Sequence, residues 1–424
     1  MTTFDNSKDN NQTTQALAVL STLFFMWGLI TVFSGILIEN ELKNAFELTY
    51  NKAILLSVIF FATYFVVAFP AGVLIDRIGF KNGIISGLLI AAVGCLTFYL
   101  AASKISYPLT VTALFILASG ITILQVCANP YVVMIGMRGR GASRLTLVGA
   151  FNSLGTVIAS YFGTKLVASE SGALDPESIK AASAEIVKGP YLLLAGILCL
   201  LAIFIGFSKL PKVATKGIEP LIKDTVPPRK NVFQFHHVVL GAIAIFAYVG
   251  AEVGIFNYLL TKSSYDEKTV DTMIKCYWGA AMVGRFIGAA VLTKISPRKM
   301  MAICSTVASL LVLGFIFMVP AEPGGDWNNA LWMLVGVGLF NSVLFPCIFA
   351  MGIDGLGQFA EEGSSMLIMA IVGGSVVPYI LLRNIDASNP STAKVSFLVL
   401  IACYLFILFY GLKGSRYEKR TNFY

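Results

Sequence analysis

Residues 53–102 read AILLSVIFFATYFVVAFPAGVLIDRIGFKNGIISGLLIAAVGCLTFYLAA. Two apolar runs, 53–76 and 82–102, are separated by a short polar turn. Each run is long enough to cross a bilayer as a helix, which takes about 20 residues. The runs do not alternate between polar and apolar residues, as the strands of a membrane barrel do. This stretch therefore predicts two membrane helices joined by a tight turn.

Similar runs recur along the whole chain, so the sequence predicts an all-α membrane protein with twelve transmembrane helices. The predicted spans of the first half are 17–38, 53–76, 82–102, 108–136, 145–168 and 189–208. Those of the second half are 237–261, 270–293, 299–320, 329–352, 364–383 and 393–412.

The composition excludes several classes of protein. Of 424 residues, 57% are hydrophobic and only 13% are charged, whereas soluble domains carry about 25% charged residues. Mean hydropathy is +0.78, so most of the surface must face lipid. A soluble enzyme, a nucleic-acid-binding module and a disordered scaffold are therefore excluded. The net charge of +8 is interpreted as a set of topology determinants.

A basic, proline-rich segment, 209–236, divides the chain into two sets of six spans. The expected organisation is an N-terminal tail (1–16), a six-helix bundle (17–208), the linker (209–236), a second bundle (237–412) and a C-terminal tail (413–424). Lysine and arginine concentrate in the linker, the C-terminal tail and alternate loops. By the positive-inside rule, we expect both termini to be cytoplasmic and the protein to lie in the inner (plasma) membrane.

The two halves are weakly repeated. GASRL (141–145) and AFNSLG (150–155) have counterparts in GSSML (363–367) and IVGG (371–374), offset by about half the chain. Gly72 corresponds to Gly288 at a similar offset. Two pseudo-symmetric six-helix bundles with this kind of repeat are typical of transporters whose site lies between the halves, near the bilayer midplane.

The turn between the second and third spans, GVLIDRIGFK (72–81), is similar to the signature loop of the major facilitator superfamily. The matching residues are Gly72, Asp76, Arg77, Gly79 and Lys81. The resemblance implies a conformational latch, in which Asp76 pairs with a basic group or a helix N-terminus in one state only. Arg285 lies in a degenerate second copy, GRFIG (284–288), and we expect it to serve the same gating function.

Further segments resemble one branch of that superfamily, the L-fucose permease family with its glucose/galactose and N-acetylglucosamine transporters. They include FFMWGLIT (24–31), LASGITILQVCANPYV (117–132), AFNSLGT (150–156), YVGAEV (248–253), YWGAAMVGRFIG (277–288), LFNSVLFP (339–346) and MAIVGG (369–374). The resemblance implies a proton- or sodium-coupled sugar importer that works by alternating access as a monomer. It also implies that Gln125 stands where the fucose permease has a membrane carboxylate.

The chain also departs from the family pattern. Gly35 takes the position of an aspartate, and Thr146 and Gly149 replace amides in the fifth span. Fewer amides then remain to read hydroxyl groups in the first half. This weakens the case for a plain hexose and gives more weight to a more apolar, derivatised or non-sugar substrate.

Glu252 is the only acidic residue well inside a predicted span. A carboxylate at membrane depth is costly and is a functional hypothesis by default. We expect Glu252 to bind the coupling ion, with acceptance of substrate hydroxyls as the other open function. Arg285 could pair with Glu252 if their helix faces meet.

Polar and aromatic side chains inside the spans are the candidates for substrate binding. Gln125 and Asn129 are one turn apart and share a helix face, and amides suit sugar hydroxyls because they both donate and accept. The full expected substrate set is Gln125, Asn129, Asn152, Tyr248, Asn257, Trp278 and Asn341. Pro130 and Pro346 are expected to kink their spans.

No cofactor, metal or catalytic site is expected. The seven cysteines lie in apolar runs without metal-ligand spacing, and we find no nucleophile–base pair at membrane depth. The expected function is import of a monosaccharide or amino sugar. The alternatives left open are an importer of another solute (an amino acid, a carboxylate or a siderophore) with the same fold and a transport-inactive nutrient sensor.

Overall fold

The structure is a computed structural model that describes residues 6–37, 50–137, 139–167, 176–211, 213, 230–261, 267–320, 322, 325–386 and 388–417. Within them the chain is helical, and the only strand-like pairing is an isolated bridge between Asp386 and Asn389. Parts of the predicted linker and of both predicted tails (212, 214–229, 1–5 and 418–424) lie outside the described residues.

The chain divides into two compact units. Unit 1 comprises Met1–Gly136 and Phe151–Val213, and unit 2 comprises Met137–Ala150 and Ala214–Tyr424. Helix α5 (Gly141–Val167) therefore belongs to unit 2 through its first ten residues and to unit 1 thereafter. The linker 209–236 was the predicted boundary, and α5 is the part of the chain that this division assigns to both units.

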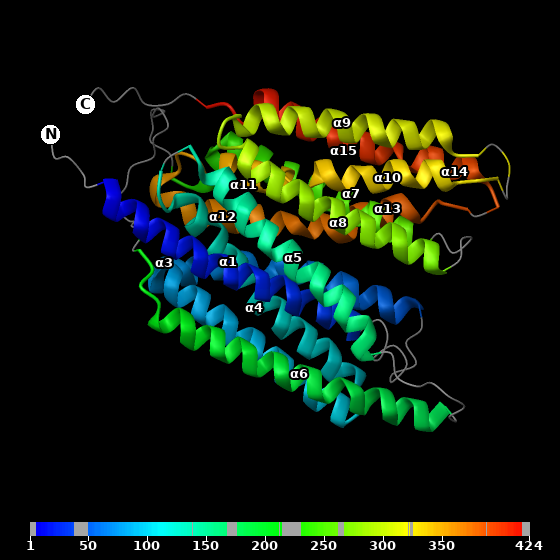
Figure 1. The fold of residues 1–424 in the computed structure, drawn as a ribbon, viewed down its shortest axis with the longest axis horizontal. Coiled ribbons are helices and arrows are strands. Elements are labelled where there is room, and N and C mark those ends of the chain that lie inside the picture. Colours follow the sequence, from blue (N-terminus) through cyan, green and yellow to red (C-terminus); the bar gives the residue numbers. More distant parts are fainter. Residues whose placement is uncertain are drawn as a thin grey trace. The chain divides into compact units, whose positions relative to one another are not determined.

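Unit 1 is built from long helices. They are α1 (Asn6–Leu37), α3 (Tyr50–Ser103), α4 (Tyr107–Met134), the later part of α5, and α6 (Pro176–Phe207). Helix α3 packs against α4 and α6 (Figure 1). Its 54 residues are two helices joined at Gly79, whose φ of 78° and ψ of 165° are not helical. The second and third predicted spans are thus the two halves of α3.

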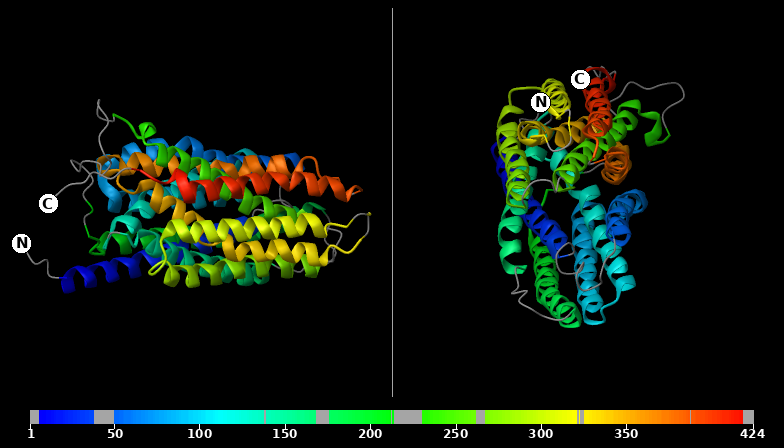
Figure 2. Two further views of the ribbon diagram at one scale, coloured as in Figure 1. Left: turned by 90° about the horizontal axis from the view of Figure 1, so that it is seen from above. Right: turned by 90° about the vertical axis from the view of Figure 1, so that its right-hand side faces the viewer.

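Unit 2 holds the remaining helices. They are α7 (His236–Thr261), α8 (Glu267–Val291), α9 (Pro297–Met318), α10 (Asn328–Asn341), α11 (Leu344–Ile353), α12 (Ala360–Met369), α13 (Gly373–Leu382), α14 (Pro390–Ser396) and α15 (Leu398–Phe409). Short 3-10 turns η2 (Val232–Gln234), η3 (Gly357–Phe359) and η4 (Ala370–Val372) and a π-helical end η5 (Tyr410–Gly414) complete the unit. Helix α7 packs against α11, α12, α13 and α15, and α9 packs against α10 and α15 (Figure 2).

Each of the twelve predicted spans is matched by helix in the described residues, which confirms the twelve-helix, all-α fold. Nine helical stretches are long and apolar enough to cross a membrane in the part of the chain that the structure describes. One of them, Leu55–Ser103, holds two spans. Helices α5 and α8 supply the two spans that are not among the nine. Helix α1 begins at Asn6 rather than at residue 17.

Three of the spans in unit 2 are interrupted. Helices α10 and α11 are separated at Ser342–Val343, α12 and α13 at η4, and α14 and α15 at Phe397. Pro346 lies four residues after Ser342 and has no N–H to donate to the Ser342 carbonyl. The expected kink at Pro346 is therefore present as a break between two helices.

Close glycine crossings repeat in the two units. A Cβ on Gly28 would lie 2.1 Å from the Asn152 carbonyl oxygen, so α1 and α5 cross in near contact. A Cβ on Gly373 would lie 2.2 Å from the Phe246 carbonyl oxygen, at the crossing of α7 with the α12–α13 span. These are spans one with five, and seven with eleven. The weak sequence repeat thus corresponds to a repeated packing contact.

Replacing Gly373 with alanine is expected to destabilise the protein. The added methyl has no room beside the Phe246 carbonyl, and such overpacking costs about 1–3 kcal/mol. The midpoint of thermal unfolding in detergent should fall. Gly279→Ala is the matched control, because nothing lies within 4 Å of its added Cβ, and its midpoint should be unchanged or higher. Equal midpoints for the two variants would contradict the crossing.

Candidate functional site

The predicted intramembrane carboxylate, Glu252, lies in a hydrogen-bonded group of unit 2. It is partly buried on α7, and Tyr248, one turn earlier, donates its hydroxyl to the Glu252 Oε1 at 2.7 Å. Tyr277 of α8 donates to the Glu252 backbone carbonyl at 3.3 Å. The carboxylate therefore accepts from one phenol, Tyr248, and a second phenol, Tyr277, holds the backbone of the same residue.

Arg285 of α8 supplies the positive charge of this group. Its Nε donates to the Ser342 carbonyl at 3.3 Å, which is the carbonyl that Pro346 cannot pair. Its Nη1 donates to the Gly149 carbonyl in the first part of α5, also at 3.3 Å. Tyr277, also on α8, bonds to the Glu252 backbone, so α7 and α8 are neighbours here. The pairing of Glu252 with Arg285 stays a prediction.

The first part of α5 makes two further contacts with α8. Ser143 donates its hydroxyl to the Ala289 carbonyl at 2.7 Å. A Cβ on Gly288 would lie 2.2 Å from Val343 and 3.6 Å from the Thr146 methyl. The first part of α5 therefore packs on α8 along the segment from Arg285 to Ala289.

Asn341, at the end of α10, is fully enclosed. Its Nδ2 donates to the Tyr277 hydroxyl at 3.4 Å, and its Oδ1 accepts from the Tyr404 hydroxyl at 2.9 Å. All three residues are 0% exposed. Asn341 therefore links α8, α10 and α15, and its amide already has partners on both sides.

The other expected substrate residues of unit 2 lie around this group. Trp278 is half-buried, with ring centroids 5.3 Å from Tyr277 and 5.4 Å from Phe256. Tyr248 lies 6.3 Å from Phe345, centroid to centroid. Asn257 is half-buried farther along α7. Of these rings, Tyr248 contacts the carboxylate directly, and Trp278 joins Tyr277 and Phe256 in one aromatic cluster.

The expected amides of unit 1 lie on α4 and α5. Gln125 of α4 donates its Nε2 to the Tyr64 hydroxyl of α3 at 2.9 Å. Asn129, one turn later, is 1% exposed, and its Nδ2 has no hydrogen-bond partner in the described part of the chain. Asn152 of α5 donates to the Phe24 carbonyl at 2.9 Å. Gln125 and Asn129 therefore share a face, as the spacing predicts.

The signature loop lies at the break in α3. Gly79 occupies the positive-φ region, which a side chain rarely adopts, and Gly72 is buried. Asp76 and Arg77 are exposed. Lys81 donates its Nζ to the carbonyls of Gly206 (2.8 Å) and Ser208 (2.9 Å), and so caps the C-terminal end of α6.

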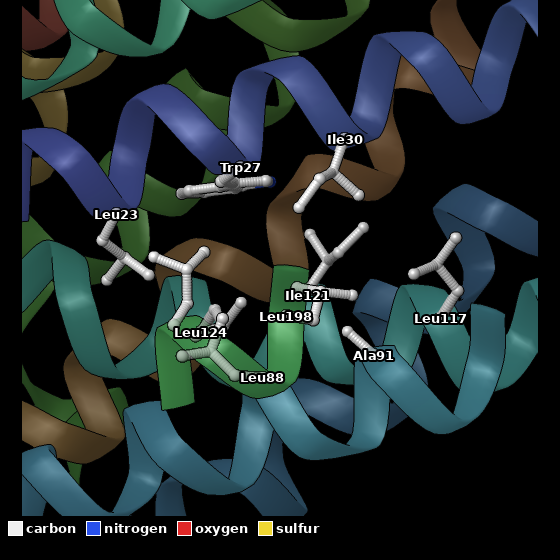
Figure 3. A pocket seen from close by; sticks show the side chains of 10 residues that line it. Leu23, Trp27, Ile30, Leu88, Ala91, Leu117, Ile121, Leu124 and Leu198 are labelled. Carbon is white, nitrogen blue, oxygen red and sulfur yellow. The ribbon is translucent and has the colours of Figure 1, made fainter. Parts of the chain in front are cut away.

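One small cavity in unit 1 is not a candidate for a polar solute (Figure 3). It is lined only by apolar side chains, among them Trp27, Leu88 and Leu124, and its volume is about 10 Å³. It offers no partner for a hydroxyl and has hardly room for one water. No group of three or more potential metal ligands occurs among the described residues.

Three tyrosines, Tyr64, Tyr277 and Tyr404, were not singled out from sequence. Tyr64 and Tyr277 each accept a hydrogen bond from an amide on a neighbouring span, and Tyr404 completes the second pair. A search of the spans for carboxylates and amides alone passes over phenolic hydroxyls. Tyrosines in the middle of a span, at matching positions in the two halves, were the available signal.

Comparisons with known proteins agree with this architecture. The model of the family described as Major Facilitator Superfamily matches residues 18–377. A Brucella abortus protein named glucose/galactose transporter is 44% identical over 407 residues, covering 95% of this chain and 94% of the relative. An Escherichia coli L-fucose-proton symporter is 30% identical over 428 residues, covering 96% and 94%.

A solved structure is also similar. The crystal structure of FucP, a Major Facilitator Superfamily transporter in the outward conformation, has a TM-score of 0.82 and 28% identity, covering 94% of this chain and 98% of that one. The family model, the near full-length relatives and the twelve helices in two repeated units together show that the chain is a multi-pass membrane transporter and belongs to the Major Facilitator Superfamily.

Proposed function

We propose that this protein is a proton-coupled importer of a hexose, with glucose or galactose as the first candidates. The observation that carries the proposal is 44% identity to a glucose/galactose transporter along 95% of the chain. A proton is the proposed coupling ion because the E. coli relative is a proton symporter. The similarity to the glucose/galactose transporter favours a plain hexose as the substrate. We give it more weight than the replacement of two family amides by Thr146 and Gly149 in the first half.

Sugar contacts are proposed from Gln125, Asn129, Asn152, Tyr248, Asn257 and Trp278. For Asn341, which the sequence predicts as a further contact, we propose a supporting function. Both sides of its amide are occupied by tyrosines, so it holds Tyr277 beside Glu252 and does not meet the sugar.

Glu252 is the proposed proton carrier. It is the only acidic residue well inside a span, and its Oε1 already accepts from Tyr248. A carboxylate at membrane depth is costly and marks a functional site by default. A group that binds and releases a proton during each cycle would meet that description.

Gating is proposed at the signature loop (Gly72, Asp76, Arg77, Gly79, Lys81) and at Arg285. Arg285 bonds to α5, and α5 continues into unit 1. Alternating access then requires the first part of α5 to leave α8 in one state. We further propose cytoplasmic termini, an inner-membrane location and a monomeric transporter.

Uptake into proteoliposomes tests the substrate and the coupling together. Labelled glucose, galactose and N-acetylglucosamine are offered with an imposed proton or sodium gradient. We expect proton-driven accumulation of one hexose by the wild type. Glu252→Gln should lose accumulation but keep gradient-independent exchange, since the amide keeps the shape and cannot carry a proton.

Glu362→Gln is the control, because Glu362 is an exposed acid at the start of α12, and it should accumulate sugar as the wild type does. Accumulation by Glu252→Gln at the wild-type level would refute the proton-carrier assignment. Failure of the folded wild type to take up any of the three sugars would refute the hexose proposal and favour another solute. Accumulation driven only by sodium would refute proton coupling.

A cross-link tests the movement of α5. Ser143 and Ala289 are joined by a 2.7 Å hydrogen bond, so their backbones are close enough for a disulfide. In a Cys276→Ser background, oxidation of the Ser143→Cys, Ala289→Cys double variant should stop uptake, and a reductant should restore it. Each single variant should transport with and without oxidant. Full uptake by a protein shown to be cross-linked would contradict the proposed opening.

A further inference from the structure

The two units contain matching tyrosine–amide pairs. In unit 1, Gln125 of the fourth span donates to Tyr64 of the second span. In unit 2, Asn341 of the tenth span donates to Tyr277 of the eighth. The spans correspond under the repeat of the two bundles, so each unit has an amide–tyrosine bond between its second and fourth spans.

The surroundings of the two pairs differ. In unit 2, Tyr404 donates to the second side of the Asn341 amide, and Tyr277 continues to the Glu252 carbonyl. That amide is bonded through both its nitrogen and its oxygen and is 0% exposed, so a ligand cannot reach it in this structure. In unit 1, the Gln125 carbonyl oxygen accepts no hydrogen bond from any described residue.

Asn129 is a second feature that distinguishes the surroundings of the pair in unit 1 from those in unit 2. Its Nδ2 is buried without a partner among the described residues. Leaving a buried amide donor unpaired costs about 1–3 kcal/mol, and such groups are rare enough that each needs an explanation. Asn129 lies one helical turn from Gln125 on the same face of α4. A free acceptor and a free donor therefore occur side by side on one helix.

We propose that Tyr64 is a positioning residue that fixes the Gln125 amide, so that Gln125 and Asn129 together accept from and donate to adjacent sugar hydroxyls, while the Tyr277–Asn341 pair serves packing. This inference rests on the proposed sugar transport and assigns hydroxyl recognition to unit 1. Vicinal hydroxyls suit the arrangement, because each is both donor and acceptor. The unpaired Asn129 donor is satisfied when the sugar binds.

The decisive comparison is Asn129→Leu against Asn341→Leu. Both replace a buried amide with an apolar side chain of similar size. Asn129→Leu removes an unpaired donor, so the thermal midpoint of the purified protein should stay equal or rise, while the KM for uptake rises roughly tenfold for each lost hydrogen bond to the sugar. Asn341→Leu strands the buried hydroxyls of Tyr277 and Tyr404, so its midpoint should fall.

Tyr64→Phe tests the positioning function, with Tyr277→Phe as the matched control. Both variants lose one phenolic hydroxyl. Tyr64→Phe should raise KM with little change in kcat, and it should reduce the discrimination between the transported hexose and its deoxy analogues. Tyr277→Phe should lower the thermal midpoint and keep the wild-type discrimination.

The outcomes distinguish failure of this inference from failure of the proposed function. Wild-type uptake with an unchanged KM in Asn129→Leu would overturn this inference and leave the proposed transport intact; the Asn129 donor would then be bonded to water. A lower midpoint in Asn129→Leu, equal to that of Asn341→Leu, would also overturn it. No uptake of any hexose by the folded wild type would overturn the proposed function and this inference with it.

Discussion

The constraint on which the structure depends is that every backbone polar group in the hydrocarbon core must be paired within the protein. Helices satisfy it for nearly all of the chain. At Pro346 the pairing within the helix fails, because the Ser342 carbonyl loses its intrahelical donor. Arg285 pairs with that carbonyl. The position of this guanidinium on α8 therefore depends in part on one missing N–H.

The two bundles share one arrangement of helix crossings but carry different polar side chains. Glycine crossings at Gly28 and Gly373 let the first and fifth helices of each bundle touch. Against that common framework, the second bundle gathers the carboxylate, the guanidinium and an enclosed amide. The first bundle keeps amides with unused bonding capacity. Under the proposals above, the second bundle would handle the ion and the first bundle the solute.

Much of the fold could be predicted from sequence, because span length and apolarity are local properties. The same reasoning found Glu252, Gln125 and Asn129 as costly polar groups in apolar helices. It could not find Tyr64 as the partner of Gln125. The two residues are 61 positions apart in sequence, and their contact depends on how α3 and α4 are rotated about their axes. The bond from Arg285 to the Ser342 carbonyl could not be found either. It depends on the break between α10 and α11, and nothing in the sequence marks which side chain pairs with the carbonyl left free there.

Lys81 has a consequence for how the protein is made. Its ammonium group caps carbonyls at Gly206 and Ser208, about 125 residues later in the chain. At ribosomal rates, those carbonyls emerge on the order of ten seconds after the turn between the second and third spans. During that interval the lysine lacks these two acceptors. The contacts that the signature loop makes through Lys81 can therefore form only after the sixth helix has been synthesised.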